Sequence, residues 1–182
     1  MKKTLSLHVG PTLVGMNDKH IRQAINMTNR SRKAILYTAD VNASEKPMSF
    51  ALERQPSKQV ERIESAVHGL GEAVVVVDYF HNVSTACAKS IVRAFYRKPG
   101  VHFVLRGLNV DPCGEAYPSM VVVAPHVTEL VRLRANCEVC NAHASMPFDK
   151  SGELGSLDSD RFKPRCWDCW RTGMLANGRL PS

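Results

Sequence analysis

The chain has six cysteines, and four of them form two closely spaced pairs. Cys137 and Cys140 enclose two residues, and Cys166 and Cys169 enclose two more. Two CxxC pairs allow four thiolates to converge in the tetrahedral arrangement that a zinc ion prefers. The intervening segment, residues 141–165, is longer than in common zinc ribbons, and a loop would accommodate the excess. Because protein ligands would fill all four positions, the pattern predicts a structural zinc ion and not a catalytic one.

The remaining two cysteines and the two tryptophans of the chain are the next residues to interpret. Cys87 fits the buried face of a predicted helix, whereas Cys113 lies in a polar loop and its role stays open. Trp167 and Trp170 flank the second cysteine pair. Packing over the zinc module is favoured for these tryptophans over stacking on nucleic-acid bases.

A glycine-containing segment near the amino end is the second candidate for chemistry. Gly10 and Gly15 have the spacing of a phosphate-binding P-loop, whose backbone amides hold phosphate at a helix amino terminus. Such a loop ends in lysine and then serine or threonine, which neutralise phosphate charge and bind magnesium. Met16 and Asn17 occupy those two positions here. The segment therefore predicts a nucleotide loop that has lost both of these groups.

Alternating strands and helices are needed to position these segments, and the apolar periodicity predicts them. The predicted strands are Leu5–Val9, Ala34–Thr38, Glu72–Asp78, Val101–Leu108 and Val127–Arg134. The predicted helices are Ile21–Asn29, Val60–Leu70, Ser84–Arg97 and Met120–His126, and Asp40–Pro56 is polar and irregular. This alternation predicts an α/β fold with a mainly parallel sheet. The β-branched run that ends on Asp78 is typical of a central strand buried on both faces.

Composition divides the chain and excludes several classes of protein. Cysteines, glycines and polar residues replace apolar runs after Ala135, which predicts an α/β domain over 1–135 and a zinc module over 136–182. With 44% hydrophobic and 23% charged residues, the chain is that of a folded protein. No apolar run approaches the length of a membrane span, and no export signal is recognised, so we expect a cytoplasmic protein that contacts no membrane. The net charge of +7 permits anionic partners without identifying one.

Five blocks of the sequence resemble the type II thymidine kinases, in the same order and at similar spacing. The blocks are Gly10–Asn17, Val74–Asp78, Gly107–Pro118, Val127–Cys140 and Arg165–Cys169. The resemblance implies a RecA-like P-loop sheet flanked by helices, with a small zinc-ribbon and lasso module. It implies nucleotide contacts at Gly10, Thr12, Gly15, Met16, Asn17 and Asp78. It implies a nucleoside pocket at Leu108, Pro112, Tyr117 and Phe162, and it suggests a homo-oligomer.

The departures from the family pattern bear on activity. The family's proposed general base, a glutamate, is matched here by Tyr79, and a phenol with an ordinary pKa of about 10 is a poor base. Pocket aromatics of the family fall on Pro112 and Asn82, and a lasso tyrosine falls on Phe162. Losing one electrostatic stabiliser of a transition state typically costs about 3 to 4 kcal/mol. Loss of the lysine and the base together should abolish useful phosphoryl transfer.

The sequence thus favours a catalytically impaired thymidine-kinase-like protein that binds a nucleotide or another protein, with zinc as its cofactor. ATP with magnesium is doubtful as a cofactor. The alternative is a divergent, active nucleoside kinase, in which Asp78 and Glu115 would act. Lys19 would then replace the lost lysine, and Glu115 or His81 would serve as the base. A second alternative is a nucleic-acid-binding module, since basic residues lie near several element ends, but solvated surface charge is the plainer explanation.

Overall fold

Six parallel strands form the main sheet within the residues that the computed structural model describes, namely 3–11, 33–38, 49–51, 56–150 and 162–179. Their order across the sheet is β3-β2-β4-β5-β1-β6. The strands are β1 Leu5–Gly10, β2 Lys33–Thr38, β3 Ser49–Ala51, β4 Ala73–Asp78, β5 Val101–Leu108 and β6 Glu129–Arg132. Since β1, β4 and β5 lie together at the centre, their carboxyl ends meet at one edge of the sheet.

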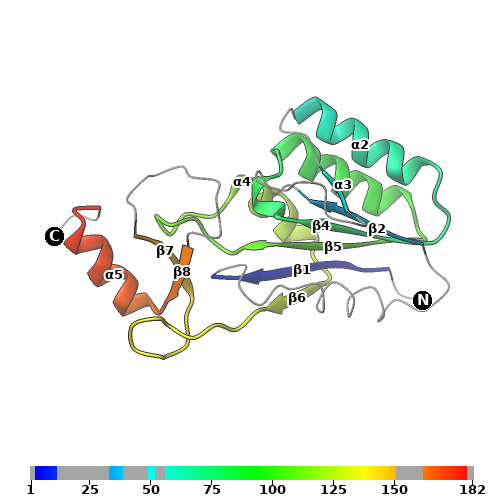
Figure 1. Cartoon of the computed structure of the whole chain (residues 1–182). Coiled ribbons are helices and arrows are strands. Elements are labelled where there is room, and N and C mark those ends of the chain that lie inside the picture. The colour runs from blue at the N-terminus through cyan, green and yellow to red at the C-terminus, as the bar shows by residue number, and fades with distance from the viewer. Residues whose placement is uncertain (1–2, 12–32, 39–48, 52–55, 151–161, 180–182) are drawn as a thin grey trace.

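Helices cover one face of this sheet, where α2 and α3 lie side by side (Figure 1). The helical elements are α2 Pro56–His68, η1 Phe80–Asn82, α3 Thr85–Arg97, α4 Pro118–Val123 and η2 Ala124–His126. The main core lies between them and the sheet, and it takes one set of alternating strand residues, such as Leu7, Val75 and Phe103. The other set, including Val74, Val76 and Val104, forms a smaller cluster on the second face.

Local sequence explains the central elements. Residues 73–77 of β4 are alanine and four valines, all fully buried, because β-branched side chains pack well on both faces of a pleated sheet. Helix α3 begins after Ser84, whose hydroxyl oxygen accepts the amide N–H of Cys87 at 3.2 Å. Cys87 itself is fully buried, as predicted, and burial raises the pKa of its thiol to about 12.

A small module follows the sheet at the carboxyl end of the chain (Figure 1). It consists of the antiparallel strands β7 Met146–Asp149 and β8 Phe162–Arg165 with helix α5 Trp167–Ala176. Four buried side chains, Met146, Phe148, Trp170 and Met174, form its own core. The boundary between residues 135 and 136 stays a prediction.

The α/β class and the parallel sheet predicted from the sequence are confirmed. One expectation was wrong: the stretch Asp40–Pro56 is not irregular throughout, because Ser49–Ala51 pairs in parallel with β2 as the edge strand β3. Strand β6 is also shorter than predicted. The helix predicted over Ile21–Asn29 lies outside the described residues.

Candidate active site and metal centre

A row of polar side chains crosses the second face of the sheet at the carboxyl ends of its central strands. The register pairs Thr38 with Asp78, and His8 with Arg106. Strands β4 and β5 are paired through Val77 and Leu105, which brings Asp78 next to Arg106. Side chains directly across parallel strands point to the same face, so these four residues lie on one line.

The two central members of this row form an ion pair. Nε of Arg106 lies 3.6 Å from Oδ1 of Asp78, and the side chains are 2% and 14% exposed. The same carboxylate oxygen accepts the backbone N–H of Tyr79 at 3.0 Å. A charge held this far from water needs an opposite charge or hydrogen bonds. Asp78 therefore has a compensating cation within the protein itself.

The residue after Asp78 has an uncommon backbone conformation. Tyr79 has φ 53° and ψ 38°, in the left-handed region that non-glycine residues rarely adopt. This turn sends the chain from the end of β4 directly into η1. The phenol of Tyr79 stands at the position where the family resemblance placed the general base, and a phenol is a weak base near neutral pH.

His81 lies buried beneath this turn and is held neutral. Its Nδ1 accepts the backbone N–H of Leu108 at 3.3 Å, so the proton of the neutral ring resides on Nε2. Burial lowers the pKa of His81 to about 3. The ring of Tyr117 lies 5.0 Å away, centroid to centroid. With Nδ1 occupied and Nε2 buried, His81 is a structural link between η1 and β5 and is poorly placed to act as a base.

The loop after β5 is folded by Asp111. Its Oδ1 accepts the backbone N–H groups of Cys113 and Glu115 at 2.9 and 2.8 Å. Gly114 adopts φ 89°, a conformation that suits glycine, and a side chain there would meet Trp170. Glu115 is exposed, and its carboxylate has no hydrogen bond or ion pair to any described residue. The structure does not bring Glu115 into contact with Asp78.

The predicted nucleoside-pocket residues are brought together only in part. Leu108 and Tyr117 both contact His81, as described above, and Leu108 is fully buried. The carbonyl of Pro112 accepts the indole N–H of Trp170 at 3.0 Å, so it faces the small module. Phe162 is buried opposite Asp149 in the β7–β8 hairpin, and among the described residues no ring contact joins it to Tyr117.

The four paired cysteines form one cluster. Cys137 and Cys140 precede β7, Cys166 follows β8, and Cys169 lies in the first turn of α5. Their sulfur atoms all lie within 4.8 Å of one another, and Cys140 Sγ is 3.6 Å from Cys166 Sγ. Around a tetrahedral zinc with Zn–S bonds near 2.3 Å, sulfurs are about 3.8 Å apart, so the spacing fits this ion. Backbone amides point at the sulfurs: Val139 donates to Cys137, and Cys169 donates to Cys166, both at 3.5 Å.

The four neighbouring thiols perturb one another's ionisation. Burial disfavours ionisation of Cys137, but backbone amides outweigh it and lower its pKa to about 6. Hydrogen bonding with the thiols of Cys166 and Cys140 raises the pKa of Cys169 to about 12. Four thiolates this close would repel one another, and a divalent cation would relieve that repulsion. The donor set therefore suits Zn²⁺, with all four positions taken by protein.

An ion-pair network holds the two cysteine pairs together. The guanidinium of Arg165, which precedes the second pair, donates to Oε1 of Glu138 inside the first pair from Nε and Nη2, at 3.3 and 3.2 Å. Its Cζ lies 3.5 Å from the ring centroid of Phe148, and its Nη1 donates to the carbonyl of Cys169. Lys150 also contacts Glu138, at 3.3 Å. These contacts orient the loops that carry the metal ligands.

The sequence was compared with models of known protein families. The family model for thymidine kinase matches residues 3–170, which is most of the chain. The chain belongs to the thymidine kinase family. No curated protein gives a significant match. None of the described helices of this thymidine kinase family member is long and apolar enough to cross a membrane.

In this family member, the described residues include only the first part of the predicted nucleotide loop. Gly10 ends β1, and its carbonyl accepts the N–H of Asn109 at 3.1 Å, next to the loop after β5. The remaining predicted contacts, Thr12, Gly15, Met16 and Asn17, lie outside the described residues, as does Lys19. Their part in nucleotide binding stays a prediction.

Sequence reasoning missed Arg106, the residue that contacts Asp78. Arg106 lies in β5, a strand whose eight residues are all buried. A signal was present, because an arginine inside an apolar strand of a parallel sheet requires a partner. The partner itself depends on the pairing of β4 with β5, which the sequence pattern does not specify.

The two tryptophans differ in their surroundings. Trp170 packs into the module core, as predicted, whereas the ring of Trp167 stacks on that of Trp170 and is 55% exposed.

Proposed function

We propose that this thymidine kinase family member is a binding or regulatory protein that has lost phosphoryl transfer but retains affinity for nucleotide phosphate. The observation that carries the proposal is the ion pair between Asp78 and Arg106. In an active P-loop enzyme, the aspartate at the end of this strand serves a magnesium ion. Here a buried guanidinium already balances its charge, and a second cation beside it would meet like-charge repulsion.

Two sequence departures support the same conclusion. Met16 offers no charge to a terminal phosphate, and Tyr79 offers no effective base to a nucleoside hydroxyl. Glycine-loop amides bind phosphate without help from lysine, so nucleotide affinity survives these changes. The four cysteines would hold a structural zinc ion that maintains the small module and leaves no open coordination position for catalysis.

The direct test is phosphorylation of thymidine by the purified zinc-loaded chain with ATP and magnesium. We expect no product above a no-protein control. Turnover that Asp78→Asn abolishes, and that Asp168→Asn at an exposed position of α5 leaves intact, would contradict the proposal. That result would establish a divergent, active nucleoside kinase.

Calorimetric titration with ATP tests the binding part separately. Because Arg106 already compensates Asp78, we expect the same dissociation constant with magnesium and in magnesium-free buffer. A tenfold or greater tightening by magnesium, lost in Asp78→Asn, would mean that Asp78 still serves a metal. Absence of ATP binding in both buffers would limit the function to a partner other than nucleotide.

A further inference from the structure

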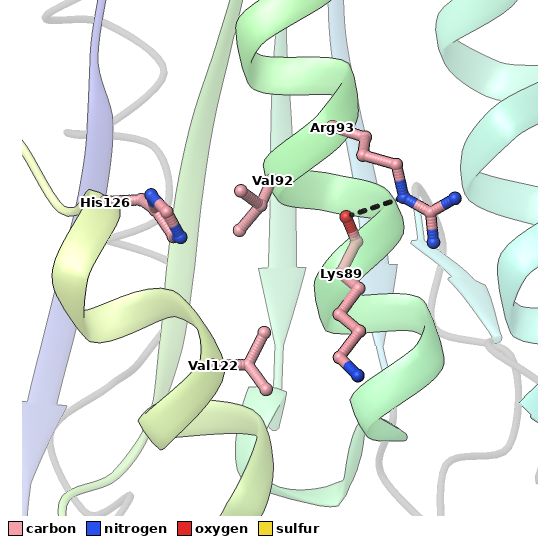
Figure 2. A pocket seen from close by; sticks show the side chains of 5 residues that line it. All are labelled: Lys89, Val92, Arg93, Val122 and His126. Carbon is pink, nitrogen blue, oxygen red and sulfur yellow. Dashed lines mark hydrogen bonds between the residues drawn. The ribbon is translucent and has the colours of Figure 1, made fainter.

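A groove runs between α3 and the α4–η2 segment, on a face of the molecule away from the site at β4 and β5. It has a volume of about 400 Å³ and is lined by five residues, Lys89, Val92, Arg93, Val122 and His126. Figure 2 shows the two valines facing one another across the groove. Lys89 extends along the α3 side, and His126 stands on the η2 side (Figure 2). Arg93 turns from α3 toward α2, and its Nε donates to the carbonyl of Lys89 at 3.4 Å. The groove thus combines an apolar floor with a cationic rim.

The two elements that form the groove carry charge of one sign. Helix α3 carries Lys89, Arg93 and Arg97 four residues apart, which places them on one side of the helix. Neither α3 nor the segment 118–126 contains an aspartate or glutamate. These three cations form no ion pair with any described residue.

Acidic groups on the neighbouring elements α2 and β6 form no ion pair with these cations among the described residues. Glu64 belongs to α2, and its carboxylate accepts the hydroxyl of Ser90 on the side of α3 that faces α2. Glu129 is exposed at the start of β6 and is not among the residues that line the groove. An anionic partner would therefore meet an uncompensated positive surface.

Apolar and aromatic surface lies beside the cations. Tyr96 is 63% exposed and Val121 is 58% exposed, large values for such side chains. The hydroxyl of Tyr96 hydrogen-bonds with Nδ1 of His126 at 3.1 Å, which fixes one wall of the groove. Contact with the two valines would contribute little to the binding of a nucleic-acid phosphate backbone. Burial of an apolar side chain against them would contribute favourably to binding, because apolar surface leaves water. An exposed aromatic next to cations is typical of protein interfaces.

We propose that this groove binds an acidic amphipathic segment of a partner protein. An apolar side chain of the partner lies between Val92 and Val122, and its carboxylates contact Lys89 and Arg93. A second copy of this chain is a poor occupant, because pairing this face with itself would bring like charges together. The proposal concerns a face separate from Asp78, so it stands or falls independently of the proposed loss of kinase activity.

Fluorescence anisotropy with the full zinc-loaded chain tests the proposal. The probe is a labelled helical peptide of about 16 residues with leucine and glutamate on adjacent faces. Two comparison peptides replace either glutamate with glutamine or leucine with serine, and a single-stranded DNA of similar length is the competing class. We expect the acidic amphipathic peptide to bind at least tenfold more tightly than either comparison peptide, because both features contribute.

Variants locate the binding. The double change Lys89→Glu and Arg93→Glu should weaken peptide binding at least tenfold, and Val122→Asn should weaken it severalfold. The matched control, Lys163→Glu with Arg171→Glu, makes the same charge change at exposed positions of the small module and should leave the dissociation constant unchanged. Circular dichroism confirms that each variant is folded.

Three outcomes would overturn the proposal. The first is no peptide binding at roughly millimolar concentration. The second is peptide binding that the charge reversal at Lys89 and Arg93 does not alter. The third is DNA binding tighter than peptide binding that the same reversal abolishes and Val122→Asn leaves intact, because that pattern would assign the groove to nucleic acid.

Discussion

The guanidinium of Arg106, on β5, lies beside the carboxylate of Asp78, on β4, with Nε 3.6 Å from Oδ1 and the arginine 2% exposed. The two residues are separated along the chain and meet because the sheet pairs their strands in register. Each provides the charge that makes burial of the other tolerable. The residue for which the family resemblance implies a nucleotide contact thus has an internal cation beside it.

Loss of Arg106 should destabilise the fold markedly. Arg106→Met keeps much of the volume but leaves Asp78 without its cation, so we expect the free energy of unfolding to fall by about 3 kcal/mol. Urea unfolding followed by far-ultraviolet circular dichroism measures the change. In the double variant with Asp78→Asn, the loss should be smaller than the sum of the two single losses by about 1 kcal/mol or more. Strict additivity would show that the two side chains are not coupled.

Buried His81 should make stability depend on pH. The unfolded chain binds a proton at this histidine near pH 6.5, whereas burial lowers the pKa of the folded state to about 3. The unfolded state therefore binds more protons between these values, and stability falls as pH is lowered, by up to about 1.4 kcal/mol per unit from this residue. His81→Gln should flatten the dependence measured by urea unfolding between pH 7.5 and 5. His143→Gln, at an exposed histidine, should retain the original slope; an unchanged slope in His81→Gln would exclude His81 as the cause.

The four-cysteine site should hold one zinc ion per chain. Native mass spectrometry should show this ion, and Cys140→Ser should remove it and lower the free energy of unfolding by about 3 kcal/mol or more. Cys113→Ser is the matched control, because Cys113 is exposed and lies outside the cluster. Equal zinc content in both variants would rule out the assignment of Cys140 as a ligand.

Glu138 should govern how long the metal stays bound. Glu138→Gln removes the charge that Arg165 and Lys150 contact, while all four thiols remain. Since groups behind the ligands typically change metal affinity by about 10- to 100-fold, we expect zinc transfer to a chromogenic chelator to accelerate in that range. Glu115→Gln alters an exposed carboxylate elsewhere and should transfer zinc at the original rate. Identical rates for the two variants would mean that the network does not support the site.

Close packing should make Gly107 intolerant of a side chain. A Cβ at this position would lie 2.6 Å from Met120 Cε and 3.0 Å from the backbone nitrogen of His81. We expect Gly107→Ala to lower the free energy of unfolding by about 1 to 3 kcal/mol, because the backbone of η1 must shift. Gly69→Ala is a suitable comparison, since a Cβ there meets no atom within 4 Å. A loss no larger than that of Gly69→Ala would contradict the packing argument.

Features with a strong local signature were predictable from the sequence. The valine run of β4 and the Ser84 cap of α3 each contain within a few residues the reason for their structure. The cysteine spacing likewise indicated the metal cluster, because each CxxC pair is itself a local arrangement. The three-residue edge strand β3 was not predictable, since so short a segment has no distinctive period.

The polar environment of Asp78 could not be predicted, for a different reason. Its contact with Arg106 depends on which strands pair and in which register, and neither follows from a local pattern. The hydrogen bond from Leu108 to His81 is also long-range in sequence. Because the polar contacts at this sheet edge depend on such pairings, the candidate site was harder to infer than the fold.

The stacked indoles of Trp167 and Trp170 have a practical consequence. They are the two tryptophans of the chain, with ring centroids 5.1 Å apart, and both belong to α5 beside the second cysteine pair. Tryptophan fluorescence, excited selectively at the long-wavelength end of protein absorbance, will therefore report on the small module and not on the sheet. Melting curves from emission and from backbone ellipticity should superimpose if the chain unfolds as one cooperative unit. Curves that separate would reveal a module that opens while the sheet persists.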